Sequence, residues 1–159
     1  STNIVSHVGL SNVWRSVMGN SHARPTKEQF EQMKTLVEEA MQNGARGLSC
    51  MLAAPPDSLA TREELVELCK IVKKHGGIFV VHIRNEGTGV FDAIREVIEI
   101  GRLAGITVEI LHIKIADQQY WGRMGEIIKL IDDARKAGVN IGANIYPYTR
   151  GNNNLASII

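Results

Sequence analysis

The chain has 159 residues, of which 44% are apolar and 22% are charged, and its formal net charge is +1. These values are ordinary for a globular domain; the balanced charge argues against a nucleic-acid partner, and the lack of an eighteen-residue apolar run argues against a membrane partner. Two cysteines are too few for a disulfide framework, which favours a reducing, cytoplasmic location.

The first half of the chain predicts an opening strand and two helices. Residues 4–8 are strand-like. Each helix opens on a capping box, in which a threonine accepts a backbone hydrogen bond from the residue three positions on, whose Gln or Glu side chain reaches back. The two capping boxes are Thr26 with Gln29, and Thr61 with Glu64. The helices are expected to end at Gly44 and Gly76, where glycine stops a helix.

Four apolar segments rich in β-branched residues recur roughly every thirty positions and predict strands. They are residues 45–50, 78–83, 107–113 and 139–145. Two further helices are expected between them, at about residues 90–103 and 122–136. This alternation predicts an α/β fold with a parallel sheet, and a partial TIM-type (β/α) barrel fits best. A doubly wound open sheet is the alternative, although no Gly-x-Gly-x-x-Gly motif follows any strand.

Two histidines end successive predicted strands in the same context, Val-Val-His82-Ile-Arg and Ile-Leu-His112-Ile-Lys. The carboxyl ends of parallel strands form the mouth in which α/β barrels keep their chemistry. Because neutral imidazole is the commonest protein ligand for zinc, we predict that His82 and His112 bind a metal. The alternative is that they are buried strand histidines hydrogen-bonded to backbone carbonyls.

Three residues near the predicted mouth are candidates for substrate binding. Arg84 and Lys114 each lie two residues after one of the histidines, so strand geometry places each cation on the same face as its histidine. The alternative for both is a surface salt bridge, with Glu86 or Asp117 as the partner. Tyr146 lies in a Tyr-Pro-Tyr turn after the last strand and could bind a substrate carbonyl, unless the turn only packs over the mouth.

The remaining candidates are weaker. Cys50 could be a ligand or a nucleophile, but the sequence offers it no evident base partner. His7 is a weak ligand candidate near the end of the opening strand, whereas His22 and His75 are expected in a loop and at a helix end. The chain opens without methionine and stops on the apolar residues 155–159. We therefore expect residues 1–159 to be a single incomplete domain cut from a longer protein.

Taken together, these segments resemble the N-acyl-D-amino-acid deacylases (D-aminoacylases) of the amidohydrolase superfamily. The matching text runs along nearly the whole chain and is specific through its order and spacing. It includes Arg24-Pro25-Thr26, Ala45-Arg46-Gly47-Leu48-Ser49, His82-Ile83-Arg84-Asn85-Glu86-Gly87, His112-Ile113-Lys114 and Tyr146-Pro147-Tyr148.

The resemblance implies that this chain holds roughly the third to seventh strand units of a metal-dependent (β/α) barrel. It implies a site for one or two Zn²⁺ ions, with His82 and His112 as ligands at the ends of the fifth and sixth barrel strands. It also implies that a metal-activated water hydrolyses the amide of a small N-acyl-D-amino acid. The other ligands and the general-base aspartate would lie outside this chain, so we expect no catalytic residue in it and no activity from it alone.

The chain also departs from the family. The family phrase Gly-Leu-Ser-Thr-Gly-Leu-x-Tyr-Pro-Pro-Gly is changed here at Cys50, Met51, Ala54 and Asp57, and the phrase Asp-x-Tyr-Pro-Tyr begins with Asn144. A cyclic-amide hydrolase of the dihydroorotase type therefore stays open as an alternative, as does a non-catalytic barrel or pseudoenzyme. The exposed edges of an incomplete barrel also predict self-association.

Overall fold

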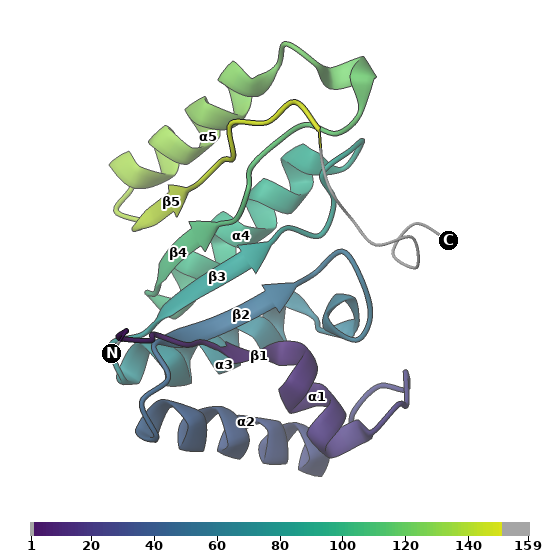
Figure 1. Ribbon diagram of the computed structural model, residues 1–159, viewed down its shortest axis with the longest axis vertical. Helices are drawn as coiled ribbons and strands as arrows, with labels where there is room; N and C mark the ends of the chain where they lie inside the picture. Colours follow the sequence, from purple (N-terminus) through teal and green to yellow (C-terminus); the bar gives the residue numbers. More distant parts are fainter. Residues whose placement is uncertain (1, 151–159) are drawn as a thin grey trace.

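The computed structural model describes residues 2–150, and it contains one sheet of five parallel strands in sequential order. The strands are β1 (Val8–Gly9), β2 (Gly47–Met51), β3 (Ile78–His82), β4 (Thr107–Ile110) and β5 (Ile141–Ala143). Their carboxyl ends lie along one edge of the sheet (Figure 1). Sequential parallel order is that of a barrel wall, whereas a doubly wound sheet reverses its strand order. The apolar segment 155–159 lies outside the described residues.

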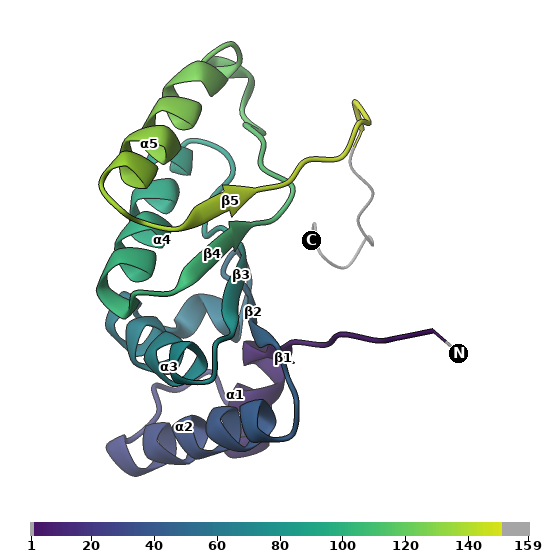
Figure 2. The ribbon, with the colours of Figure 1, turned by 90° about the vertical axis from the view of Figure 1, so that its left-hand side faces the viewer.

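Five α-helices connect and cover the strands. They are α1 (Leu10–Met18), α2 (Lys27–Gln42), α3 (Arg62–Lys74), α4 (Val90–Ala104) and α5 (Met124–Lys136), with the short 3₁₀ turns η1 (Asp57–Leu59) and η2 (Gln118–Tyr120). In Figure 2 the helices lie on one side of the curved sheet, and no helix within residues 2–150 covers the other side. None of these helices is long and apolar enough to cross a membrane.

The hydrophobic core fills the space between the sheet and the helices. In β3 and β4 the alternate residues Phe79, Val81, Val108 and Ile110 are fully buried. Because successive side chains of a strand point to opposite faces, the residues between them face the open side of the sheet. His82 is one of these residues, so the core register of β3 directs its imidazole away from the helices.

The predicted capping boxes are both present. At the start of α2, Thr26 Oγ1 accepts from Gln29 N at 3.2 Å and Gln29 Oε1 accepts from Thr26 N at 2.8 Å. The same two bonds, of 3.2 and 2.9 Å, join Thr61 and Glu64 at the start of α3. Each box satisfies backbone groups that a helix terminus would otherwise leave unpaired.

The beginning of the chain differs from the sequence-based prediction. The expected strand over residues 4–8 is wrong in extent, because only Val8–Gly9 pairs with β2. Helix α1 follows immediately and was not predicted, since Gly9 gives it no side-chain cap. The apolar spacing of Leu10, Val13 and Trp14, all buried in the structure, was the available signal.

Asp57 is a buried carboxylate that ties the loop after β2 to α1. It is 2% exposed, its Oδ1 accepts from Ser11 Oγ at 2.6 Å, and its Oδ2 accepts from Met51 N at 2.7 Å. Burial raises the pKa of the Asp57 carboxyl above its ordinary value, against these two hydrogen bonds, which lower it. Ionisation of Asp57 is therefore less favourable in the folded protein than in the unfolded chain.

This shift predicts the sign of a pH effect on stability. The pKa of Asp57 is higher in the folded protein than in the unfolded chain. Its ionisation therefore lowers the free energy of unfolding as the pH rises from the pKa of the unfolded chain through that of the folded protein. Asp57→Asn keeps an acceptor for Met51 N and a donor for Ser11 Oγ but cannot ionise. We therefore expect the variant to gain stability relative to wild type as pH rises from 4 to 8 in urea unfolding series.

The matched control is Asp57→Ala, which removes both hydrogen bonds. It should cost about 1–3 kcal/mol because Met51 N is left without its acceptor. If Asp57→Asn instead lost stability relative to wild type over the same rise in pH, folding would stabilise the ionised carboxylate. The pKa of Asp57 would then be lowered by folding, and not raised.

Candidate metal centre

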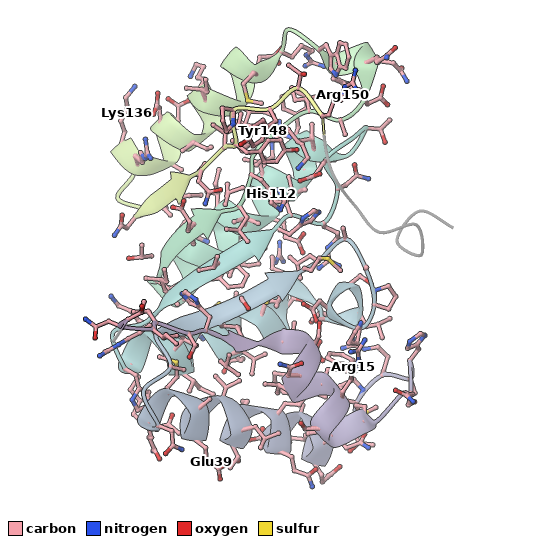
Figure 3. All side chains as sticks on the ribbon, in the orientation of Figure 1. Arg15, Glu39, His112, Lys136, Tyr148 and Arg150 are labelled. Atoms are coloured by element: carbon pink, nitrogen blue, oxygen red, sulfur yellow. The ribbon has the colours of Figure 1, made fainter. Side chains whose placement is uncertain are left out.

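The structure brings His82 and His112 together at the carboxyl edge of the sheet. His82 is the last residue of β3, and His112 lies just after the end of β4. His82 Nδ1 and His112 Nε2 are 3.0 Å apart, and the two rings meet edge to face with centroids separated by 4.6 Å. In Figure 3, His112 lies near the carboxyl end of β4.

Glu86, in the loop between β3 and α4, completes a three-residue cluster. Its Oε1 lies 3.2 Å from His112 Nδ1 and 3.7 Å from His82 Nε2. Among residues 2–150, His82, Glu86 and His112 are the one group of at least three potential metal ligands whose donor atoms all lie within 4.8 Å of one another. The sequence pointed to Glu86 only as an ion-pair partner.

Lys114 belongs to the same cluster. Its Nζ lies 2.6 Å from Glu86 Oε1 and 3.0 Å from His112 Nδ1, and it donates to the His112 carbonyl oxygen at 3.1 Å. It also lies over the ring of Tyr146, 5.7 Å from the centroid. Lys114 and Tyr146 therefore lie beside the histidines, and the ion pair between Lys114 and Glu86, which the sequence left as an alternative, is present.

Arg84 does not join this cluster. Its guanidinium pairs with Glu96 of α4 at 2.9 Å and donates to the carbonyl oxygens of Ser58 and Ala60 at 2.8 and 3.1 Å. The predicted place of Arg84 at the rim beside His82 is therefore wrong. The alternative of a salt bridge holds for Arg84, but its partner is Glu96, and neither Glu86 nor Asp117. Strand alternation cannot be extended to Arg84 because β3 ends at His82.

The backbone of His112 is held in an unusual conformation. Its φ is +39°, and it is the one non-glycine residue with a positive φ within residues 2–150. Such a conformation costs free energy and persists only where neighbouring groups hold it. Here His112 N donates to Asn144 Oδ1 at 2.7 Å, and Asn144 Nδ2 in turn donates to Glu109 Oε1 at 3.0 Å. Asn144 thus links the ligand loop to a carboxylate on β4.

The two imidazoles fit a zinc ion. Zinc–nitrogen bonds of about 2.0–2.1 Å at a tetrahedral angle place two ligand nitrogens about 3.3 Å apart, close to the 3.0 Å between His82 Nδ1 and His112 Nε2. Burial holds the pKa of His82 below its ordinary value, and the charges of His112 and Lys114 lower it further, against the opposing charge of Glu86. A lowered pKa favours neutral imidazole, which is the form that binds metal.

Cys50 and His75 lie away from this centre. Cys50 is buried in the core, and burial raises the pKa of its thiol well above the ordinary value, which disfavours the thiolate that a ligand or a nucleophile requires. His75 follows α3 and its Nε2 lies 2.7 Å from a carboxylate oxygen of Glu38 on α2. This is the helix-end position that the sequence predicted for it.

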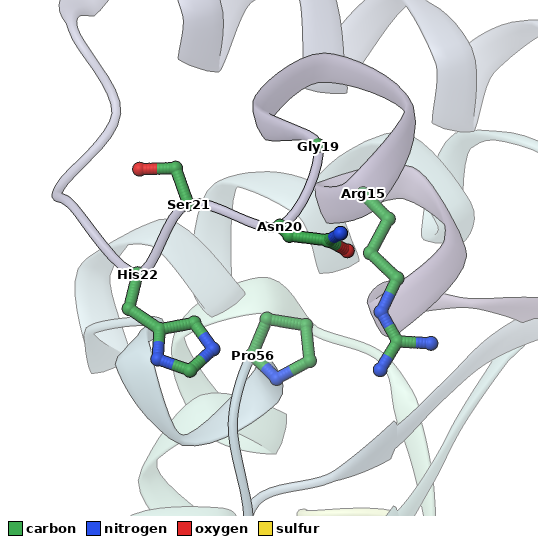
Figure 4. A pocket seen from close by; sticks show the side chains of 6 residues that line it. All are labelled: Arg15, Gly19, Asn20, Ser21, His22 and Pro56. Carbon is green, nitrogen blue, oxygen red and sulfur yellow. The ribbon is translucent and has the colours of Figure 1, made fainter.

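A separate hollow of about 230 Å³ lies where α1 ends (Figure 4). It is lined by Arg15, Gly19, Asn20, Ser21, His22 and Pro56. His22 lies in the loop after α1, as the sequence predicted. None of the lining residues belongs to the histidine cluster, so this hollow is not part of the candidate metal centre.

Comparison with known proteins identifies the relatives of the chain, although no protein-family model matches it. Over 149 residues it is 37% identical to D-aminoacylase of Alcaligenes xylosoxydans xylosoxydans, a match that covers 94% of this chain and 31% of that protein. The chain is a homologue of the D-aminoacylases. The chain is also 34% identical, over 146 residues, to N-acyl-D-glutamate deacylase of the same organism, with 92% and 30% of the two chains covered.

Solved structures of these deacylases share the fold of this chain. N-acyl-D-glutamate deacylase from Bordetella bronchiseptica, in complex with zinc and a phosphonate inhibitor, matches with a TM-score of 0.88 and 35% identity over 92% of this chain and 31% of its own. A D-aminoacylase structure matches with a TM-score of 0.83 and 32% identity over 89% and 30%. The five-stranded sheet is therefore a segment of the amidohydrolase barrel, and the chain spans about 30% of the length of these relatives.

Proposed function

We propose that this chain is the central part of a zinc-dependent amidohydrolase that hydrolyses the amide bond of N-acyl-D-amino acids. The observation that carries the proposal is the pair His82 Nδ1 and His112 Nε2, 3.0 Å apart at the ends of adjacent parallel strands. The substrate class is supported by the two curated relatives, which are a D-aminoacylase and an N-acyl-D-glutamate deacylase.

In this proposal His82 and His112 hold the ion. Zinc bound there would lower the pKa of a water molecule and polarise the amide carbonyl. The chain's own contribution is to present two neutral imidazoles on rigid strand ends, where the backbone of His112 is fixed through Asn144. The remaining ligands and a general-base aspartate would come from other parts of the barrel.

Lys114 and Tyr146 are the proposed substrate contacts. An ammonium group has three N–H donors, and those of Lys114 already reach Glu86 and the His112 carbonyl oxygen. The third is free to bind a substrate carboxylate when His112 Nδ1 carries a proton and accepts no bond. The ring of Tyr146 beside Lys114 places a second hydrogen-bonding group at the same side of the cluster.

Exposed apolar surface beside β5 and α5 supports the proposal that residues 1–159 are only part of a barrel. An apolar hollow of about 310 Å³ lies there, lined in part by Ile128 and Ile145, which are 52% and 69% exposed. Exposed apolar surface of this kind is normally covered in a stable protein. We propose that the next strand and helix of the barrel cover it in the full-length protein, and that the 159-residue chain alone self-associates through this edge.

Hydrolysis assays test the proposed function. We expect the zinc-loaded full-length protein to release free D-amino acids from N-acyl-D-amino acids, with the L-enantiomers turned over at least about tenfold more slowly because the site binds a chiral centre. Removal of zinc by a chelator should abolish turnover, and added zinc should restore it. The isolated 159 residues should show negligible activity.

Three results would contradict the proposal. Turnover of dihydroorotate in preference to N-acyl-D-amino acids would favour a cyclic-amide hydrolase. A metal-loaded protein with no amide hydrolysis at all would indicate a non-catalytic barrel. Hydrolysis by the isolated 159-residue chain would show that the missing ligands and base are not required.

A further inference from the structure

We propose that Glu86 is a positioning residue that keeps His112 in the tautomer able to bind metal, against competition from Lys114. This inference rests on the proposed function, because it assumes that His112 Nε2 is a ligand. It concerns the other ring nitrogen, Nδ1, which faces two groups of opposite character. Lys114 Nζ lies 3.0 Å from Nδ1, and Glu86 Oε1 lies 3.2 Å from it.

Glu86 and Lys114, the two neighbours of His112 Nδ1, favour different tautomers of the ring. A carboxylate can only accept, so contact with Glu86 favours a proton on Nδ1 and leaves a lone pair on Nε2. An ammonium can only donate, so contact with Lys114 favours a lone pair on Nδ1 and a proton on Nε2. Only the first arrangement leaves Nε2, the nitrogen that faces His82, free to bind a metal.

Glu86 acts on this competition in two ways. Its Oε1 lies 3.2 Å from His112 Nδ1, close enough to attract a proton on that nitrogen, and its ion pair of 2.6 Å with Lys114 draws the ammonium protons to the carboxylate. The Glu86 side chain is 14% exposed, so water competes little for its oxygens. Metal-binding histidines generally donate their second ring N–H to a carboxylate or carbonyl, and this contact fixes the tautomer.

The loop that carries Glu86 is held in place by its own hydrogen bonds. The Glu86 carbonyl oxygen accepts from Ala116 N at 2.7 Å, which joins the loop after β3 to the loop after β4. Asn85 Oδ1 accepts from Gly87 N at 2.8 Å and from Gly89 N at 3.2 Å, which closes the turn into α4. These bonds fix the backbone of the loop that carries the Glu86 carboxylate.

The effect is directed at His112 more than at His82. The 3.7 Å between Glu86 Oε1 and His82 Nε2 is longer than a hydrogen bond, whereas the contact with His112 Nδ1 is within reach of one. Glu86 is also not needed as a ligand in this scheme. Its Oε1 lies near His82 Nε2 and His112 Nδ1, whereas the proposed zinc-binding nitrogens are His82 Nδ1 and His112 Nε2.

Zinc affinity of the full-length protein tests the inference without reference to activity. We expect Glu86→Gln to weaken zinc binding about 10–100-fold in chelator competition, the usual cost of losing a carboxylate behind a ligating histidine. The control is Glu96→Gln, which removes a carboxylate of the same kind that pairs with Arg84 and touches neither histidine. It should leave zinc affinity within about twofold of wild type.

A second variant isolates the role of Lys114. In the double variant Glu86→Gln with Lys114→Met, the competing donor is gone, so His112 Nδ1 can again carry the proton. We expect this double variant to bind zinc at least about tenfold more tightly than Glu86→Gln does. A double variant that binds zinc as weakly as Glu86→Gln would overturn the inference. That is the result expected if Glu86 were itself a zinc ligand.

The inference and the proposed function fail in distinguishable ways. If His112→Ala leaves zinc bound, the proposed function itself is wrong. If His112→Ala releases zinc while Glu86→Gln stays within about twofold of wild type, only the role of Glu86 is wrong. Nitrogen chemical shifts of the His112 ring in the zinc-free protein give an independent reading: we expect the Nδ1-protonated form in wild type and the Nε2-protonated form in Glu86→Gln.

Discussion

Replacing either histidine by alanine is expected to release the metal from the full-length protein. His82→Ala and His112→Ala each remove a donor nitrogen outright, so the proposed coordination sphere loses one of its ligands. The loss should exceed the 10–100-fold caused by changes behind a ligand, so we expect zinc affinity to fall by more than about 100-fold in each variant. Elemental analysis after dialysis and chelator competition measure this directly.

The matched control for these variants is His75→Ala. His75 is also a partly buried histidine beside a carboxylate, but its partner is Glu38 on the helical side of the molecule. It should leave zinc content unchanged, and thermal unfolding should show that all three variants fold. Unchanged zinc content in either His82→Ala or His112→Ala would return that histidine to a packing role and would contradict the proposed function.

Asn144→Asp is expected to weaken the same centre without touching a ligand. Asn144 donates to Glu109 and accepts from His112 N, a pairing that only a neutral amide can make. An aspartate would face the Glu109 carboxylate at hydrogen-bonding distance, and one of the two must bind a proton or move away. Either response disturbs the His112 backbone. We expect a loss of about 1–3 kcal/mol in unfolding free energy and zinc binding weakened by about tenfold.

The partner change Glu109→Gln should reverse this effect. A glutamine at position 109 can donate to the new aspartate, so the double variant Asn144→Asp with Glu109→Gln restores the hydrogen bond in the opposite direction. Urea unfolding and zinc competition on the two single variants and the double variant give the coupling between the positions. Additive losses in the double variant would show that the Asn144–Glu109 contact does not hold His112.

Two of the departures from the deacylase phrases have polar side-chain partners in the structure. Asn144 stands where the family phrase begins with aspartate, and it faces Glu109 of β4. Asp57 stands where the family has glycine, and it binds Ser11 Oγ and Met51 N. Both changes are therefore part of polar networks of this chain, and neither removes a residue of the histidine cluster.

Sequence patterns predicted the features that depend on local chain properties. The capping boxes at Thr26 and Thr61 form because their partners are three residues away. The strand period and the parallel order follow from apolar runs separated by helices, and the repeated context of His82 and His112 placed two imidazoles at neighbouring strand ends.

Features that depend on where a strand ends were not predictable in the same way. Arg84 was expected beside His82 by strand alternation, but pairing stops at His82 and the next residues turn towards α4. Glu86 follows in that loop, and its approach to both histidines depends on a bond to Ala116 from the next loop. Such contacts join segments that share no sequence period.

The sequence by itself determined the βαβ alternation, the starts of α2 and α3, and the pair of histidines at adjacent strand ends, since each follows from local spacing and side-chain chemistry. The sequence also placed Lys114 beside His112, but only the tertiary structure decided that Arg84 leaves the histidines and that Glu86 joins them. It turned Arg84 towards Glu96 and brought Glu86 to His112. The physical reason is that loop backbone after each strand, and not strand periodicity, directs these side chains.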